Sequence, residues 1–213
     1  MKFSICLVDF EGSFAHFLYD ICKYICYGIE SAGHDCCIVK NSLDSEHINI
    51  LVGSHRLTDP IMVEKVNRAG KYILFQTEII TGDTINHWSV QKAFAEVHLP
   101  LMRNASSIWT GAVSKNRLQE MGIESEIFMM GYHPSMEEII HKRSKDIDFL
   151  FLGSMTPHRK KLIEELRARG GMVVSIFDDA AVYRNDLIAR TRVHLAPNQG
   201  PGMNQFGGSR ALY

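Results

Sequence analysis

The chain has 213 residues, of which 46% are hydrophobic and 22% are charged, so it can form one large or two modest domains with real cores. Its formal net charge of −1 gives no electrostatic reason to expect a nucleic acid or an anionic membrane as a partner. No apolar run approaches the roughly 18 residues that span a bilayer, and Asp9 and Glu11 interrupt the first apolar segment before a signal-peptide core could form. We therefore expect a cytoplasmic protein without a transmembrane segment.

The first 130 residues alternate short apolar runs with helical patterns. Six runs typical of buried strands lie at residues 3–8, 36–39, 49–52, 72–75, 107–109 and 126–129. Helices are expected to begin at Ser13, Asp59-Pro60, about residue 89 and Ser114. Strands that alternate with helices at this spacing predict a doubly wound domain, residues 1–130, whose parallel sheet is covered on both faces.

The rest of the chain begins with a polar, charged segment, 131–146, which we interpret as a linker. An apolar run at 147–152 is followed by Gly153-Ser154 and then by an amphipathic charged segment that stops at Gly170-Gly171. This order predicts a strand, a tight loop, a helix and a second strand. A helix, a strand and a loop rich in Gly, Pro and Asn are expected at 183–190, 193–196 and 197–205. Because only three strands precede the end of the sequence, we expect 147–213 to be a truncated second domain.

The five cysteines all lie in the first 37 residues: Cys6, Cys22, Cys26, Cys36 and Cys37. Their odd number argues against a closed disulfide framework. Cys22 and Cys26 are four residues apart and share a helix face, so a metal site with His34 or Cys36 is one interpretation. Buried free thiols are the preferred one, because cysteine is among the most buried residue types and the sequence contains no CxxC pair.

In an open parallel sheet, ligands bind beyond the carboxyl ends of the strands, so the loops after strands are the places to search. After the first strand, Glu11 and His16 lie at one helix entrance, where an imidazole near a carboxylate can act as a general base. The alternative is that Glu11 and Ser13 cap the helix while His16 is solvated. After strand 72–75, Glu78 is a second carboxylate, with His87-Trp88 further along; a simple surface loop is the alternative.

The loop at 153–161 joins a glycine turn to a helix entrance. Free amide groups at that helix end, with Ser154, Arg159 and Lys160, could hold a diphosphate and stabilise charge on a leaving group. A well-formed βαβ unit with a solvated charged face is the alternative. Asn198, Gln205 and Arg210 follow the last strand and are expected at the same sheet edge. The sequence has no GxxxxGK[ST] and no GxGxxG motif, which disfavours a P-loop NTPase and a nicotinamide-dependent oxidoreductase.

With these residues in view, the chain resembles the GT-B glycosyltransferases, nearest to the spore-maturation (CgeB-like) branch. The resemblance lies in FLGSMTPHRKKLIEELRARG at 151–170, DLIARTRVHLAPN at 186–198 and QFGGSRALY at 205–213, with weaker echoes in YILFQTE at 72–78 and GYHPSM at 131–136. It implies two Rossmann-like domains that face each other across a cleft. The nucleotide sugar would be held mainly by the C-terminal domain, the acceptor by the N-terminal one, and no bound metal would be needed.

Carried over by position, the resemblance implies that Gly153, Ser154 and Arg159 line the diphosphate and that His16 lies on the acceptor side. Asn198, Gln205 and Arg210 would neighbour the nucleotide or the sugar. The chain departs from the family pattern at Gly207, where relatives generally carry a glutamate that holds a ribose or sugar hydroxyl.

The sequence therefore predicts a glycosyltransferase that moves a sugar from a nucleotide diphosphate donor to a hydroxyl acceptor, with His16, Glu11 and Glu78 as catalytic candidates. The alternative is a catalytically inactive GT-B-like binding or interaction protein, which Gly207 and the early end of the sequence favour. A truncated second domain would expose apolar sheet surface, so self-association into a homo-oligomer is also expected.

Overall fold

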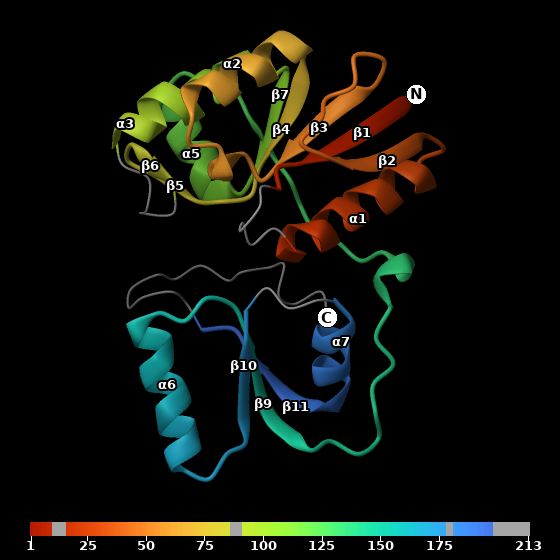
Figure 1. Ribbon diagram of the computed structural model, residues 1–213, viewed down its shortest axis with the longest axis vertical. Coiled ribbons are helices and arrows are strands. Elements are labelled where there is room, and N and C mark those ends of the chain that lie inside the picture. The colour runs from red at the N-terminus through yellow and green to blue at the C-terminus, as the bar shows by residue number, and fades with distance from the viewer. Residues whose placement is uncertain (10–15, 86–90, 178–180, 198–213) are drawn as a thin grey trace. The chain divides into compact units, whose positions relative to one another are not determined.

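The computed structural model of the chain describes residues 1–9, 16–85, 91–177 and 181–197 (Figure 1). The chain divides into two units, Met1–Gly131 and Tyr132–Tyr213. The first contains a six-stranded parallel sheet and the second a separate three-stranded parallel sheet. The α/β class and the parallel pairing that the sequence predicted are thus confirmed.

The sheet of the first unit has the strand order β2-β1-β3-β4-β7-β8. Its strands are β1 (Lys2–Leu7), β2 (Asp35–Lys40), β3 (Ile48–Val52), β4 (Tyr72–Gln76), β7 (Ser107–Thr110) and β8 (Glu126–Ile127). The register places Phe3 of β1 opposite Cys36 of β2 and Ile48 of β3. Because β2 and β3 lie on opposite sides of β1, the direction of strand addition reverses at β1.

Alternate residues of the central strands pack into two separate cores. Ile5 and Leu7 of β1 belong to one cluster, which α1 (His16–Ser31) covers, whereas Cys6 belongs to the other. The second cluster contains buried residues of α2 (Pro60–Ala69), of the π-helical turn η2 (Phe94–His98), of α4 (Leu99–Asn104) and of α5 (Ala112–Glu120). Because both faces of the sheet are buried, residues that point to either face are apolar. This explains the almost continuous apolar runs in the strands.

Helix α2 begins at the cap that the sequence predicted, whereas α5 does not. Asp59 caps α2 by accepting a hydrogen bond from the amide of Ile61, with Pro60 in the first turn, as predicted. The predicted cap at Ser114 is wrong, because α5 begins at Ala112 after Gly111. The hydroxyl of Ser114 instead accepts from the amide of Ile80 at 3.0 Å, and so joins α5 to a short ribbon.

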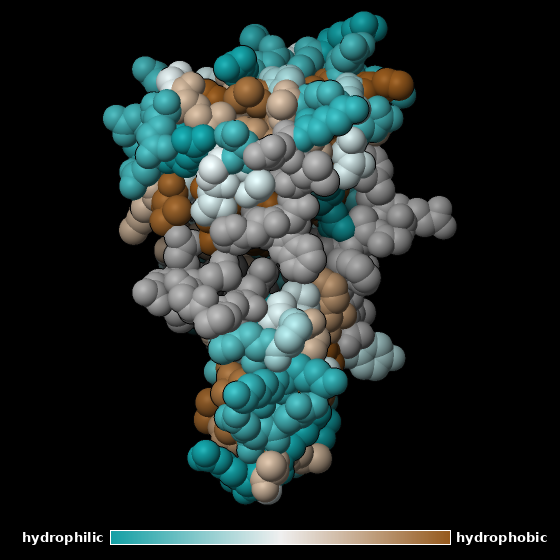
Figure 2. All heavy atoms as spheres, turned by 90° about the vertical axis from the view of Figure 1, so that its left-hand side faces the viewer, coloured by the Kyte–Doolittle hydropathy of each residue, from teal (hydrophilic) through white to brown (hydrophobic). Residues whose placement is uncertain are grey.

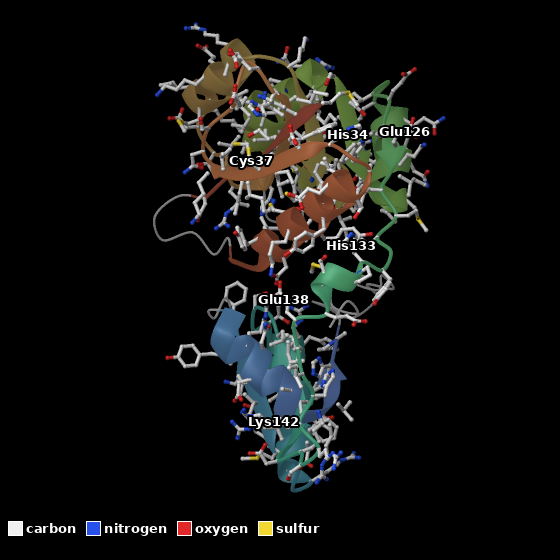
Figure 3. The ribbon with its side chains drawn as sticks, turned by 90° about the vertical axis from the view of Figure 1, so that its right-hand side faces the viewer. His34, Cys37, Glu126, His133, Glu138 and Lys142 are labelled. Carbon is white, nitrogen blue, oxygen red and sulfur yellow. The ribbon has the colours of Figure 1, made fainter. Side chains whose placement is uncertain are left out.

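That ribbon is an antiparallel pair, β5 (Ile80–Thr81) and β6 (Thr84–Ile85), which the sequence patterns did not predict. The helix predicted to begin at about residue 89 is divided in the structure into α3 (Gln91–Ala93) and η2, which leads into α4. Among the cysteines, Cys6, Cys22 and Cys26 are buried free thiols as predicted. Cys37 differs, because it lies exposed on the edge strand β2 (Figure 3).

The second unit has the strand order β10-β9-β11, with β9 (Ile147–Leu152) between β10 (Val173–Ile176) and β11 (Thr191–Leu195). Helices α6 (Pro157–Ala168) and α7 (Ala181–Arg190) lie on opposite sides of this sheet (Figure 1). Phe151, Ile163 and Val173 form the core beneath α6. The outward side of α6 is covered by hydrophilic side chains (Figure 2).

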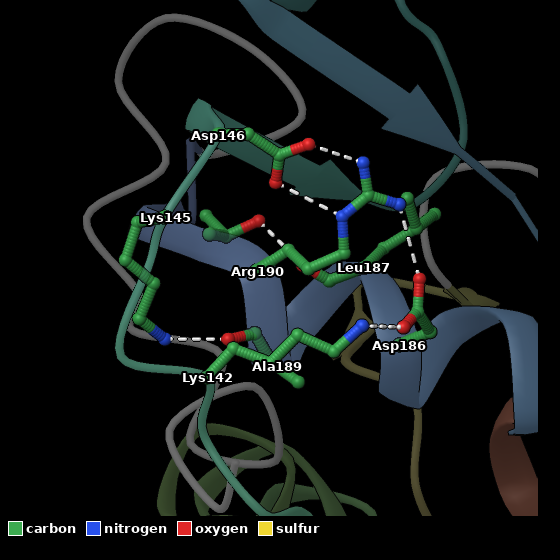
Figure 4. A network of polar contacts seen from close by, with 8 residues as sticks. Lys142, Lys145, Asp146, Asp186, Leu187, Ala189 and Arg190 are labelled. Atoms are coloured by element: carbon green, nitrogen blue, oxygen red, sulfur yellow. Dashed lines mark hydrogen bonds and ion pairs between the residues drawn. The ribbon is translucent and has the colours of Figure 1, made fainter.

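The segment before β9 is held to α7 by a polar network (Figure 4). Arg190 donates through Nε and Nη2 to the carboxylate of Asp146 and through Nη1 to Asp186. Lys142 pairs with Asp186 at 2.5 Å, and its amide donates to the carbonyl of Ala189 at 3.0 Å. A short 3₁₀ turn, η3 (Pro134–Met136), lies earlier in the same segment. None of the helices in the described part of the chain combines the length and apolar character needed to cross a membrane.

Candidate functional site

The carboxyl edge of the six-stranded sheet gathers polar residues from several loops. In sheets of this kind the crevice lies where the strand order reverses, which here is between β1 and β3. Gly53 follows β3 with a φ of +82°, and a Cβ atom there would lie 3.0 Å from Leu18 of α1. Glycine therefore allows α1 to approach the end of β3 closely. Asp9 follows β1, and His55 and Glu78 follow β3 and β4.

Asp9, the residue where the chain leaves β1, is held in place by contacts with the end of β2. The side-chain amide of Asn41 accepts from the Asp9 amide at 2.9 Å and donates to the Asp9 carbonyl at 2.6 Å. The Asp9 carboxylate pairs with Lys40 at 2.5 Å. Asn41 itself adopts a φ of +53°, a conformation that asparagine tolerates better than most residues. The end of β2 thus fixes the point where the chain leaves β1.

Glu78, a predicted catalytic residue, has a backbone fixed by two neighbouring side chains. Its carbonyl accepts from Gln76 Nε2 at 2.9 Å and from Ser114 Oγ at 3.4 Å. Gln76 is buried, and Thr110 of β7 donates to its carbonyl at 3.2 Å. Three adjacent elements therefore set the position of Glu78. Its Oε1 atom lies 3.9 Å from Nε2 of His55.

His55 belongs to the short turn η1 (Ser54–Arg56) and is mostly buried. Burial lowers the pKa of His55 to about 4, with further contributions from the charges of Arg56 and His98. Burial also lowers the pKa of His98 to about 4. Nδ1 of His98 is buried and makes no hydrogen bond within the described ranges. Both imidazoles are therefore neutral near pH 7.

The candidate donor loop of the second unit is organised by Arg159. Thr156 caps α6 by accepting from the amide of Arg159 at 3.3 Å. The Arg159 side chain is 1% exposed and lies over the ring of Phe151, 5.2 Å from its centre. It donates to the Ser154 carbonyl at 2.9 Å and, through Nε and Nη2, to the Pro197 carbonyl at 3.2 and 3.1 Å. These bonds join the loops that follow β9 and β11.

The predicted donor residues that are described do not all gather in this loop. Gly153 and Ser154 lie beside Arg159, and Gly153 has a φ of +147°, which favours glycine. Lys160 is exposed on α6 and pairs with Glu164 at 3.8 Å. Its side chain therefore belongs to the solvated face of the helix. Whether any of these residues binds a diphosphate stays a prediction.

Several predicted site residues lie outside the described residues: Glu11, Asn198, Gln205 and Arg210, as do Ser13, His87, Trp88 and Gly207. His16 is the first residue of α1, and its side chain is likewise outside the described part. Within the described ranges, no group of three or more His, Cys, Asp or Glu side chains is placed to hold a metal ion.

His55 is the residue at this edge that the sequence reasoning missed. The signal was present, because Gly53-Ser54-His55 directly follows a predicted strand, as Glu78 nearly does. Comparisons with protein-family models, with curated proteins and with solved structures find no match for the chain. Its function therefore has to be inferred from the residues at the two sheet edges.

Proposed function

We propose that the chain is a GT-B-type glycosyltransferase, which moves a sugar from a nucleoside diphosphate donor to a hydroxyl acceptor. The observation that carries the proposal is the presence of two separate parallel α/β sheets in one chain, each with polar residues after its strands. A GT-B arrangement of the two units and a cytoplasmic location are part of the proposal. The resemblance of segments 151–170 and 186–198 to that family supports it.

The donor's diphosphate is assigned to the second unit, at the entrance of α6. The loop Gly153-Ser154 follows the central strand β9, and the positive end of the α6 dipole lies beyond it. Arg159 supports this loop from beneath, because it ties Ser154 to Pro197. Arg159 would act on a diphosphate indirectly, because it fixes the conformation of the loop and adds positive electrostatic potential there. The acceptor is assigned to the first unit, near Glu78.

The proposal is tested by titrating the protein with UDP-, GDP- and dTDP-sugars in a calorimeter and by following the melting temperature. A specific donor at 100 times its Kd stabilises the folded protein by about 2.7 kcal/mol. Release of nucleoside diphosphate then reports turnover. NAD⁺ is the control dinucleotide and should produce neither effect. If no donor binds and none is hydrolysed, the proposal is wrong. Binding without turnover would favour a catalytically inactive binding protein.

A matched pair of variants locates the donor. Ser154→Asp places a negative charge in the loop, where it should repel the diphosphate and weaken donor binding at least about tenfold. Lys161→Gln changes the net charge by the same amount on an exposed position of α6 and should leave the donor Kd unchanged. Equal effects of the two variants would show that only overall charge matters and would remove the α6 entrance from the proposal.

A further inference from the structure

Two cysteines from different elements of the first unit, Cys26 of α1 and Cys36 of β2, lie against each other. Helix α1 covers the face of the sheet to which Ile5 and Leu7 point. Cys26 is buried in that core, and the half-buried Cys36 packs against the same core. The two thiols are hydrogen-bond partners, with Cys36 as the donor. Two sulfur atoms therefore meet between the helix and the edge of the sheet.

The position of β2 allows the two sulfurs to approach further. β2 is the edge strand of the sheet and is hydrogen-bonded to β1 on one side. A disulfide holds its sulfurs about 2.05 Å apart and its Cβ atoms about 3.8 Å apart. From a hydrogen-bonded contact, this geometry requires rotation of the side chains and a small displacement of the edge strand. Segment 27–35 connects the two cysteines and turns at Gly33, with a φ of +80°. The disulfide would close this short loop.

The two thiols differ in how readily they ionise. Burial raises the pKa of Cys26, and the hydrogen bond from Cys36 lowers it in part. The nearby charges of Glu30 and Cys37 raise it again. Burial also raises the pKa of Cys36, and its hydrogen bond to Cys26 raises it further. A thiolate therefore forms first on Cys26, while Cys36 keeps its proton. Because little of Cys26 is thiolate near pH 7, its attack on an oxidant is slow there.

We propose that Cys26 and Cys36 form a reversible redox switch, which a hydroperoxide closes by making a disulfide between α1 and β2. The Cys26 thiolate attacks one oxygen of hydrogen peroxide, the O–O bond breaks, and hydroxide leaves with the electron pair. The Cys36 sulfur then attacks the sulfenic acid on Cys26, the S–O bond breaks, and water leaves with the Cys36 proton. The two sulfurs lose two electrons in total, which reduce the peroxide. A dithiol reductant reverses the reaction.

The closed switch would act on the carboxyl edge of the sheet through the end of β2. Lys40 and Asn41 at that end hold Asp9, and the Asp9 amide donates to Asn41 at 2.9 Å. A displacement of β2 therefore changes how firmly the chain is held where it leaves β1. This switch does not rest on the proposed glycosyl transfer, because neither of its steps involves a sugar donor.

Peptide mapping tests whether the disulfide forms. The folded chain is treated with hydrogen peroxide, its remaining thiols are alkylated, and it is digested without reduction by a protease that cleaves after glutamate. Cleavage after Glu30 separates Cys26 from Cys36 and Cys37, so the disulfide joins two peptides. Fragmentation in a mass spectrometer should place the link between Cys26 and Cys36, and dithiothreitol should release both peptides. Absence of the link, or a link through Cys22 or Cys37, would overturn the proposal.

Three variants give the matched comparison. Cys26→Ser and Cys36→Ser should each abolish the link. Cys37→Ser is the control, because Cys37 is adjacent in sequence but points to the opposite side of β2, where its thiol donates to the Phe3 carbonyl at 3.6 Å. Its link should form within about twofold of the wild-type rate. The wild-type rate should rise about tenfold from pH 7 to pH 8, following the thiolate fraction of Cys26. A rate that does not change with pH would contradict the attack by Cys26.

Hydrogen exchange tests whether the disulfide acts as a switch. Exchange at the Asp9 amide should differ at least about twofold between the reduced and the oxidised chain, and dithiothreitol should restore the first rate. The Ile61 amide is the control, because it bonds to the Asp59 cap of α2 and has no contact with β2 through that bond. Its exchange should be the same in both forms. Equal Asp9 exchange in the two forms would overturn the switch even if the disulfide forms.

Discussion

Arg159 and Pro197 are 38 residues apart and are joined by two hydrogen bonds, from Nε and Nη2 of the arginine to one carbonyl oxygen. The same guanidinium donates to the carbonyl of Ser154 and lies over Phe151. The planar guanidinium carries five donors in a fixed geometry, whereas the ammonium group of lysine is compact and carries three. Arg159 thus holds the two loops of the carboxyl edge in one arrangement.

Replacing Arg159 should destabilise the second unit, whatever its effect on ligands. Arg159→Met removes the hydrogen bonds from a buried guanidinium to the carbonyls of Ser154 and Pro197, which should lower the free energy of unfolding by about 2–4 kcal/mol. Both tryptophans, Trp88 and Trp109, belong to the first unit. Urea unfolding should therefore show an unchanged fluorescence transition and an earlier transition in circular dichroism.

Lys160→Met is the control for this prediction, because Lys160 is exposed on the same helix and pairs only with Glu164 among the ion pairs of the described residues. Its unfolding should match that of the wild type within about 0.5 kcal/mol. An Arg159→Met variant as stable as the wild type, but unable to bind a donor, would show that the arginine serves the ligand directly.

The role of Arg159 illustrates what the sequence could predict. The apolar run at 147–152 and the amphipathic segment that stops at Gly170-Gly171 predicted β9 and α6, because such patterns depend on neighbouring residues. Burial of the arginine depends on Pro197, which belongs to a loop that tertiary structure brings near. Lys160 carries the same sign of charge one residue later but points to the solvated face. The periodicity of the sequence places Arg159 and Lys160 on one helix. It cannot show which of the two side chains is buried, because that depends on contacts with the rest of the second unit.

The same limit applied in the first unit. Glu78 was predicted from its position after a strand, and the structure places its carboxylate near His55. The pairing required the lateral order of β3 and β4, which periodicity does not give. Ser114 resembled a helix cap by residue type, whereas the actual start at Ala112 left its hydroxyl to bind the β5 amide of Ile80. Polar contacts between residues this far apart in the sequence depend on the order of the strands in the sheet, which local sequence patterns do not show.

Asn41 should contribute to stability through two separable effects. Asn41→Ala loses both hydrogen bonds to the Asp9 backbone and places at a φ of +53° a residue that tolerates this conformation less well than asparagine, so we expect a loss of about 1–3 kcal/mol in unfolding free energy. Asn41→Gly loses the bonds but adopts this φ freely, so its loss should be smaller. Tryptophan fluorescence during urea unfolding measures both. Identical losses would show that backbone strain plays no part.

The polar network on α7 should control how firmly segment 142–146 is held. Lys142 and then Arg190 lower the pKa of Asp186, so this stabilisation is present above the ordinary carboxyl pKa and is lost as pH falls through the lowered value. Asp186→Asn should therefore speed hydrogen exchange at the Lys142 amide, which bonds to Ala189. Glu64→Gln removes an exposed carboxylate that pairs with Arg68 on α2 and should leave that rate unchanged. Unaltered exchange in Asp186→Asn would contradict the prediction.

His98 should make the first unit sensitive to mild acid. Its pKa is lowered by burial to about 4 in the folded protein, against 6.5 in the unfolded chain. Above pH 6.5 neither state is protonated, and stability is unaffected. As pH falls from 6.5 towards 4, only the unfolded chain gains the proton, so unfolding becomes easier by up to about 3 kcal/mol.

His98→Met removes this effect and also removes the Nδ1 atom that has no hydrogen-bond partner in the described part of the chain. The side chains are similar in volume, so stability at pH 7.5 should be retained or raised. Between pH 6.5 and 4 the variant should lose less stability than the wild type in urea unfolding followed by fluorescence. Part of the acid loss should persist, because His55 has a similarly lowered pKa beside Arg56 and Glu78. Parallel pH profiles for the two proteins would mean that His98 takes up its proton without unfolding, and the assigned burial effect would then be wrong.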